Sequence, residues 1–253
     1  MKNPKNGFKA RLKAGELQIG LWNTIGGNIV PEILAGAGYD WVLVDCEHSA
    51  IEAVDVQSAL QAIAGYPDVS GLVRPLVNDT AIIKRMLDMG AQTLIVPYVD
   101  SVADAERAVE AMRHAPRGLR GMAGLSRATR FGRVENYAAD AEAELCLLVQ
   151  IESKGAIDAL EDIARTDGVD GVFIGPADFA ASIGYAEDIR HPKVLAAIDD
   201  VIARARAIDV PCGILCLDPA EARGYIEKGC TIVCVGVDMH LLARAADQLR
   251  TEF

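Results

Sequence analysis

The chain has 253 residues, of which 51% are hydrophobic and 24% charged, and its formal net charge is −11 at pH 7. This is the composition of a globular protein with ample material for a core, and the acidic surface argues against a nucleic-acid partner. The length is close to the roughly 250 residues of one α/β barrel. No change of composition divides the sequence, so we expect a single domain over residues 1–253.

The sequence carries no signal of secretion or of a membrane span. Its first twenty residues are cationic but lack an apolar core, so we expect no signal peptide. No segment approaches the roughly 18 uninterrupted apolar residues that a membrane helix needs. The six cysteines mostly lie in apolar runs, which predicts reduced, buried thiols in a cytoplasmic protein. Cys212 and Cys216, or Cys230 and Cys234, would be about 13 Å apart on a strand, too far to share one metal ion.

Eight short apolar runs recur along the chain and are rich in Val, Ile and Leu. Such nearly continuous runs are typical of parallel strands that are covered on both faces. The predicted strands are QIGLW (18–22), WVLVD (41–45), GLVR (71–74), TLIVP (93–97), CLLVQI (146–151), GVFIG (171–175), CGILC (212–216) and TIVCVGV (231–237).

Helical patterns lie between these runs. The clearest helices are predicted over 51–64, 80–89, 102–114, 155–166, 193–209 and 219–228. Asp79, Asp100 or Ser101, and Asp218 stand at positions where helix N-caps are expected, and Gly90 and Gly229 stand where helices should end. Eight strands that alternate with helices predict a parallel sheet closed into a (β/α)₈ TIM barrel.

One long segment, residues 116–144, interrupts the alternation with several Gly and Arg residues and weak periodicity. Segments of this length without clear elements are usually functional. We therefore expect it to fold over the mouth of the barrel.

Polar groups directly follow four of the predicted strands. In a parallel barrel the chemistry lies at the carboxyl ends of the strands, so these groups are expected to converge on one site. They are Asp45-Cys46-Glu47-His48-Ser49, Arg74-Pro75, Gln150-Ile151-Glu152 and Gly175-Pro176-Ala177-Asp178.

Glu152 and Asp178 are the expected metal ligands. Alternate residues of a strand share a face, so Gln150 and Glu152 point the same way, and Asp178 reaches the same mouth from the next strand. Two carboxylates with open positions suit a hard cation such as Mg²⁺. The alternative is that Glu152 caps a helix or pairs with Lys154.

Three further groups at the strand ends have predicted roles. His48 is the candidate acid/base, since imidazole titrates near neutral pH, and Asp45 or Glu47 is near enough in sequence to orient it. Arg74 ends an apolar strand, where its charge predicts a carboxylate or enolate partner, or an ion pair with Asp45 or Glu47. The turn at Gly175, Pro176 and Ala177 can offer backbone N–H groups to a substrate carboxylate.

Seven segments, spread over nearly the whole chain, carry a family resemblance. They are GLWNTIGGNIVPEILAGAGYDWVLVDCEHS, VRP, LIVPYV, RGLRG, VQIES, GVFIGPADF and VGVD. In this order they resemble the metal-dependent (class II) pyruvate aldolases of the 4-hydroxy-2-oxoheptanedioate and 2-keto-3-deoxy sugar acid aldolase family.

The resemblance implies Mg²⁺, Mn²⁺ or Co²⁺ at Glu152 and Asp178, an acid/base pair of His48 and Asp45, and an Arg74 that stabilises the pyruvate enolate. It implies reversible cleavage of 4-hydroxy-2-keto acids into pyruvate or hydroxypyruvate and an aldehyde, with Gln150 and residues 175–177 binding the substrate. It also implies a homo-hexamer, a dimer of trimers, in which the last helix (238–253) packs on a neighbouring barrel.

Three other functions remain open at this point. A Schiff-base aldolase would use Lys154, but this residue lies beyond the strand, where we expect it to be too exposed for that role. A carbon–carbon lyase of acyl-coenzyme A thioesters would need a nucleotide groove that this short chain does not obviously provide. A non-catalytic barrel would leave the four polar strand ends unexplained. The arginines of segment 116–144, Arg120, Arg127 and Arg130, are expected to meet an anionic aldehyde, to pair with a neighbouring subunit, or to be solvated.

Overall fold

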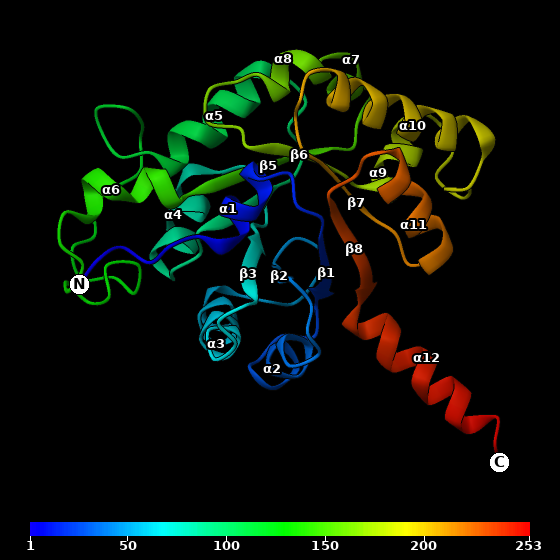
Figure 1. Ribbon diagram of the computed structural model, residues 1–253, viewed down its shortest axis with the longest axis horizontal. Coiled ribbons are helices and arrows are strands. Elements are labelled where there is room, and N and C mark those ends of the chain that lie inside the picture. Colours follow the sequence, from blue (N-terminus) through cyan, green and yellow to red (C-terminus); the bar gives the residue numbers. More distant parts are fainter.

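The structure, a computed structural model, describes residues 1–253. Eight parallel strands close into a barrel in chain order, and β8 pairs with β1 to complete it (Figure 1). The predicted fold class is thus confirmed. The strands are β1 (Gln18–Asn23), β2 (Trp41–Asp45), β3 (Ser70–Arg74), β4 (Thr93–Val96), β5 (Cys146–Ile151), β6 (Gly171–Ile174), β7 (Cys212–Leu215) and β8 (Ile232–Val237).

The helices lie around this barrel, and three of them begin at caps that the sequence offered. Asp79 and Asp218 each accept two backbone N–H bonds, and Ser101, not Asp100, caps the helix that follows β4. The helices are α1 (Gly7–Lys13), α2 (Ile29–Ala35), α3 (Ala53–Ile63), α4 (Thr80–Asp88), α5 (Val102–Met112), α6 (Tyr137–Glu144), α7 (Lys154–Asp158), α8 (Leu160–Ala164), α9 (Pro176–Ser182), α10 (Pro192–Ala207), α11 (Pro219–Lys228) and α12 (Asp238–Arg250).

Two features of the helices differ from the sequence predictions. The helix predicted over 155–166 is broken into α7 and α8 at Ala159, whose ψ of 15° departs from helical geometry. Four helices of eight residues or fewer, namely α1, α2, α6 and α9, were not among the helices singled out. Short helices show too few turns for a periodic pattern to stand out.

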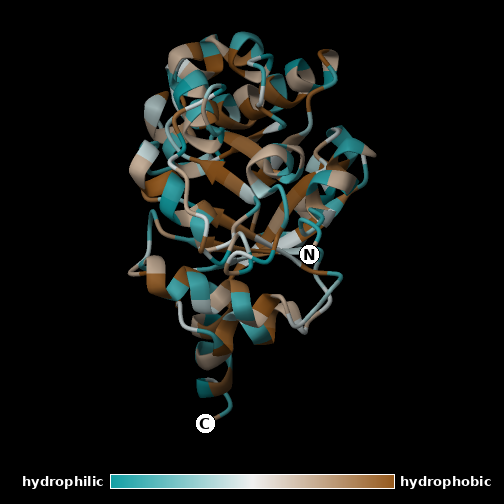
Figure 2. Cartoon of the chain, turned by 90° about the vertical axis from the view of Figure 1, so that its left-hand side faces the viewer, coloured by the Kyte–Doolittle hydropathy of each residue, from teal (hydrophilic) through white to brown (hydrophobic).

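The core has two layers, one inside the barrel and one between the strands and the helices. Figure 2 shows the strands as mainly hydrophobic ribbons surrounded by helices of mixed character. At the amino end of the barrel, α1 inserts Phe8 and Leu12 into the inner layer. Trp41 fills this layer so tightly that a Cβ on Gly20 of β1 would lie 2.0 Å from its ring.

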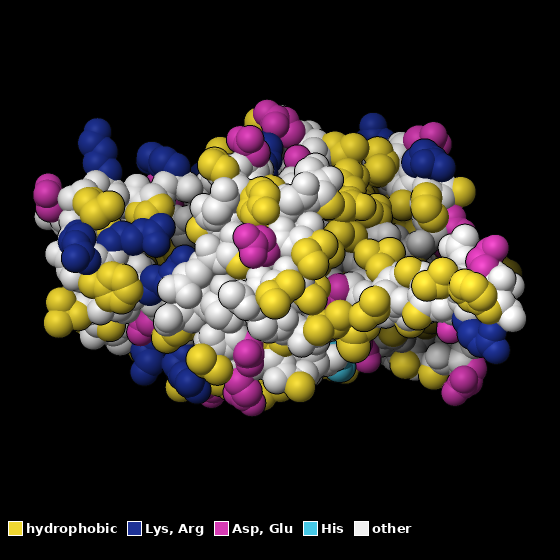
Figure 3. Space-filling view, turned by 90° about the horizontal axis from the view of Figure 1, so that it is seen from below, with side chains coloured by type: hydrophobic (Ala, Val, Ile, Leu, Met, Phe, Trp, Pro, Cys, Tyr) yellow, Lys and Arg dark blue, Asp and Glu magenta, His cyan; other side chains and the backbone are white.

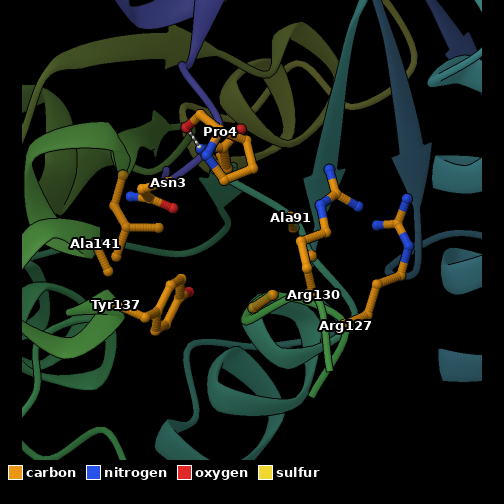
Figure 4. Close-up of a pocket in the computed structure, with 11 residues that line it drawn as sticks. Asn3, Pro4, Ala91, Arg127, Arg130, Tyr137 and Ala141 are labelled. Atoms are coloured by element: carbon orange, nitrogen blue, oxygen red, sulfur yellow. Dashed lines mark hydrogen bonds between the residues drawn. The ribbon is translucent and has the colours of Figure 1, made fainter. Parts of the chain in front are cut away.

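Segment 116–144 lies at the amino end of the barrel, so the prediction that it folds over the mouth of its own chain is wrong. It connects α5 to β5, and a helix-to-strand connection returns to the end where strands begin. Arg127 donates to the carbonyl oxygens of Met89 and Leu60. Figure 4 shows Arg127 and Arg130 extending in the same direction from this segment in a small pocket that Asn3 and Pro4 also line.

Arg120, the third arginine of the segment, is also used within the chain. Its side chain is 1% exposed and bonds to Asp88 and to the hydroxyl of Tyr137. Arg120 is therefore buried and Arg127 part-buried, and both bond to other parts of their own chain.

The six cysteines are all buried and free, as predicted. No helix of the chain is both long enough and apolar enough to cross a membrane.

The last helix, α12, projects away from the barrel (Figure 1). Asp238 is its only buried residue. Its carboxylate accepts bonds from the side chain of Asn23 and from the backbone N–H groups of Thr24 and Ile25, which follow β1. These bonds fix the point at which the helix leaves the barrel.

Candidate active site

The alternation of side chains along the strands builds the polar mouth of the barrel. Leu43, Leu72, Leu148 and Phe173 belong to the inner hydrophobic layer. Two residues further along each strand, the side chain again faces inward, now at the carboxyl end. These positions hold Asp45, Arg74, Gln150 and Gly175, all of which were predicted site residues.

Arg74 is at the centre of this polar layer. Asp45 lies opposite it in the β2–β3 register, and its carboxylate accepts bonds of 2.8 Å from Nε and 2.7 Å from Nη2. Nη1 of Arg74 lies 2.7 Å from Oε2 of Glu47 and 3.2 Å from Oε1 of Gln150. The guanidinium carbon stands 4.9 Å from the ring centroid of Trp22. The predicted ion pair of Arg74 with Asp45 and Glu47 is thus present.

The pKa values of this pair keep it ionised. Burial would raise the pKa of Asp45, but the hydrogen bonds and charge of Arg74 outweigh it and hold that pKa below its usual value. Burial likewise opposes the charged form of Arg74, and Asp45 and Glu47 nevertheless raise its pKa. A permanent cation therefore lies inside the mouth.

Glu152 follows β5 and is 1% exposed. Its Oε1 accepts the backbone N–H of Tyr98 at 2.7 Å, and its Oε2 accepts the amide of Gln150. Gln150 thus joins Arg74 to Glu152, and both ends of its amide have partners within the chain. Lys154 pairs with Asp158 instead of Glu152, so the alternative pairing considered for Glu152 is absent.

Gly175 leaves space for the Glu152 carboxylate. A Cβ at this position would lie 2.7 Å from Oε2 of Glu152 and 3.3 Å from Nε2 of Gln150. The close approach of β5 and β6 at the mouth therefore requires a residue without a side chain.

Asp178 lies in the first turn of α9 and reaches the same mouth. Its Oδ1 accepts the hydroxyl of Tyr98 at 3.2 Å, and its Oδ2 lies 3.9 Å from Nε2 of His48. The side chain of His48 is 60% exposed, and the same nitrogen is 3.9 Å from Oε2 of Glu47. The side chains of His48, Glu47 and Asp178 therefore meet at the rim.

The pairing of Asp45 with His48 that the resemblance implied is not found. Both carboxylate oxygens of Asp45 bind Arg74, and one of them also accepts the N–H of Glu47. Because both oxygens of Asp45 accept hydrogen bonds from Arg74, neither is directed at the imidazole of His48. Glu47 and Asp178 are the acidic groups nearest to His48.

Two residues of the site were not assigned roles from the sequence. Trp22 packs on Arg74, and Tyr98 contacts both Glu152 and Asp178. The rule that identified the other strand ends applies equally to Tyr98, which follows β4 by two residues, and would have included it.

Glu47, Glu152 and Asp178 place three carboxyl groups close together on one side of the mouth. Burial raises the pKa of Glu152 to about 7, with Glu47 and Asp178 adding repulsion. Burial also raises the pKa of Glu47 to about 7 despite the nearby Arg74. A divalent cation at this position would relieve both the repulsion and the burial of charge.

Glu152 and Asp178 fit such a cation by their chemistry. Both present carboxylate oxygens, and Asp178 is part-exposed, so water and substrate have access. The chain holds no group of three or more His, Cys, Asp or Glu side chains placed around one metal position. Mg²⁺ in proteins commonly binds one or two carboxylates and leaves its remaining coordination positions to water and substrate.

Comparison with known proteins supports a catalytic interpretation. A pyruvate aldolase of Rhizobium etli is 52% identical over 253 residues, covering 100% of this chain and 99% of that protein. A hydroxypyruvate/pyruvate aldolase of Sagittula stellata is 48% identical, covering 99% and 98%. The crystal structure of a family member from Burkholderia cenocepacia superposes with a TM-score of 0.94 at 41% identity, covering 98% of this chain and 99% of that one.

The family assignment follows from these similarities together with a match of the family pattern over residues 18–245. The chain belongs to the HpcH/HpaI aldolase/citrate lyase family.

Proposed function

We propose that this protein is a divalent-metal-dependent aldolase that reversibly cleaves 4-hydroxy-2-keto acids to pyruvate or hydroxypyruvate and an aldehyde. The observation that carries the proposal is the convergence of Arg74, Glu152 and Asp178 at one mouth of the barrel. The names of the relatives favour an aldolase over an acyl-coenzyme A lyase.

Aldolases of this family generally depend on a divalent metal. Glu152 and Asp178 would hold Mg²⁺, Mn²⁺ or Co²⁺. When bound, such an ion supplies Lewis-acid stabilisation of the charge that develops on the 2-keto oxygen.

Arg74 would stabilise the enolate of the pyruvate half. Asp45 and Gln150 hold its guanidinium in place before the substrate arrives, so little reorganisation is needed as negative charge develops. Trp22 shields one face of the guanidinium from water, which strengthens the interaction.

His48 would move the proton of the C4 hydroxyl. In cleavage it accepts this proton as the C3–C4 bond breaks and the aldehyde forms, and in synthesis it returns the proton to the aldehyde oxygen. Its exposed position beside Asp178 allows it to reach a substrate held at the carboxylates.

The carboxylate of the keto acid would bind at the start of α9. Ala177 and Asp178 lie in the first turn of α9, where backbone N–H groups have no partner within the helix, and Ala177 is exposed. The part-buried Gly175 and Pro176 form the adjacent wall. Gln150 would act by holding Arg74 and Glu152, since its amide is occupied on both sides.

The test is a screen for pyruvate release from a series of 4-hydroxy-2-keto acids, run with the purified protein before and after treatment with a chelator. We expect chelation to abolish release, and Mg²⁺, Mn²⁺ or Co²⁺ to restore it. Borohydride added with pyruvate should leave the protein unmodified, because Lys154 is 70% exposed, is paired with Asp158 and lacks the desolvation that activates a Schiff-base lysine. Trapping at Lys154, with activity indifferent to the chelator, would establish the Schiff-base alternative instead.

We also propose that α12 packs on a neighbouring copy within a homo-hexamer, a dimer of trimers. Leu241, Leu242 and Leu249 are 46%, 63% and 63% exposed in the single chain. The face seen in Figure 3, on the side toward which α12 projects, carries many hydrophobic side chains. Apolar surface of this kind marks an interface.

For this assembly we expect Leu242→Glu to reduce the molar mass measured by light scattering from that of a hexamer toward that of a smaller species. Because Leu242 makes little contact with its own chain, the circular dichroism spectrum should stay unchanged. An unaltered mass for the variant would contradict the role of α12, and a monomeric wild-type protein would contradict the hexamer.

A further inference from the structure

Tyr98 contacts both carboxylates of the proposed metal site. Its backbone N–H donates to Oε1 of Glu152 at 2.7 Å, and its phenol donates to Oδ1 of Asp178 at 3.2 Å. We infer that Tyr98 is a positioning residue that sets the relative placement of Glu152 and Asp178 and thereby the affinity of the site for a divalent cation. The inference rests on the proposed function, since it takes these two carboxylates as the ligands.

The backbone at Tyr98 is held in an uncommon conformation. Its φ is 50°, in the left-handed region that a non-glycine residue seldom adopts without compensating contacts. The residue lies two positions beyond β4, where a regular strand would direct its N–H toward a neighbouring strand. The turn instead directs the amide to one carboxylate while the side chain reaches the other. A strained backbone kept in place by two bonds to proposed ligands is typical of a functional position.

Asp178 depends on this bond more than Glu152 does. Glu152 is buried and accepts a second bond from Gln150. The side chain of Asp178 is 35% exposed, and within the chain its carboxylate accepts a hydrogen bond only from Tyr98. Without that bond the carboxylate is free to rotate about its side-chain torsions. Tyr98 therefore removes conformational freedom from the less constrained ligand.

The phenol suits this task because its hydroxyl carries a single hydrogen to donate. It gives one hydrogen to Oδ1 and leaves Oδ2 and the remaining lone pairs for a cation. Partners of this kind typically change metal affinity about 10- to 100-fold when they are removed.

The test is a titration of the metal-free, full-length protein with Mn²⁺, with free Mn²⁺ measured by electron paramagnetic resonance. Tyr98→Phe keeps the ring and removes only the hydroxyl, and we expect it to weaken Mn²⁺ binding about 10- to 100-fold. Tyr66→Phe is the matched control, because Tyr66 precedes β3 at the opposite end of the barrel and its hydroxyl makes no hydrogen bond within the chain. It should bind Mn²⁺ as the wild type does.

Asp178→Asn separates the possible outcomes. If Tyr98 acts through Asp178, adding Tyr98→Phe to the asparagine variant should cause no further loss of affinity. Wild-type affinity in Tyr98→Phe, alongside a loss in Asp178→Asn, would overturn the role of Tyr98 and leave the metal site standing. Wild-type affinity in Asp178→Asn, or no Mn²⁺ binding by the wild type, would overturn the metal site itself and the inference with it.

Discussion

Replacing Arg74 with alanine should lower kcat/KM by about 10²- to 10³-fold for every 4-hydroxy-2-keto acid, the cost of losing one preorganised donor to a developing negative charge. The loss should be common to all substrates because each passes through the same pyruvate enolate. Arg74→Lys should not restore activity. An ammonium group cannot make the paired bonds to Asp45 and also contact Gln150 and Glu47.

Arg74→Ala also leaves two buried acids without their partner, so stability must be measured beside activity. Removing one member of a buried ion pair typically costs about 3–5 kcal/mol, and denaturant titration would report it. Arg204→Ala is the matched control, since Arg204 forms a similar bidentate pair with Glu161 on the outer helices. It should lose stability with kcat/KM retained. Substrate-dependent losses in Arg74→Ala would argue that this residue binds the aldehyde half instead.

Removing the imidazole of His48 should slow carbon–carbon cleavage by about 10²- to 10⁴-fold, the usual contribution of a positioned acid/base. The exchange of pyruvate methyl protons with solvent should fall much less in His48→Ala, because exchange does not involve the C4 hydroxyl. Since the side chain is 60% exposed, the fold should be unaffected.

Both rates are measurable on one preparation, cleavage by pyruvate release and exchange by nuclear magnetic resonance in deuterated water. His240→Ala is the control, because His240 lies on α12 and its ring makes a hydrogen bond only with Arg244. Equal losses in cleavage and exchange in His48→Ala would show that the proposed role of this residue is wrong.

The barrel was predictable because its strands are buried on both faces. Such strands are short and continuously apolar, and each predicted run overlaps an observed strand with ends that differ by at most one residue. The short helices were harder, since one or two turns carry little periodic signal. In α7 and α8 the apolar pattern continues across Ala159 while the backbone does not, and only the structure reveals this break.

The polar mouth was predictable from the alternation of side chains along the strands. The alternation that places Leu72 and Leu148 in the inner core also places Arg74 and Gln150 two residues further along. The choice of partner was not predictable, because sequence proximity favours Asp45 for His48 while the β2–β3 register aligns Asp45 with Arg74.

Tyr98 and segment 116–144 show two limits of reading motifs without topology. The contacts of Tyr98 depend on a left-handed turn after β4 that no glycine signals. The arginines of segment 116–144 suggested a place at the mouth, although a connection from helix to strand must return to the amino end of the barrel.

Binding of the catalytic cation by Glu152 and Asp178 beside Arg74 can be observed by anomalous X-ray diffraction from crystals containing Mn²⁺ and pyruvate. We expect one strong peak per chain within coordination distance of carboxylate oxygens of both residues, with the keto acid lying between that peak and the guanidinium of Arg74. A peak elsewhere, or pyruvate seated with no metal between these carboxylates in crystals of an active preparation, would contradict it.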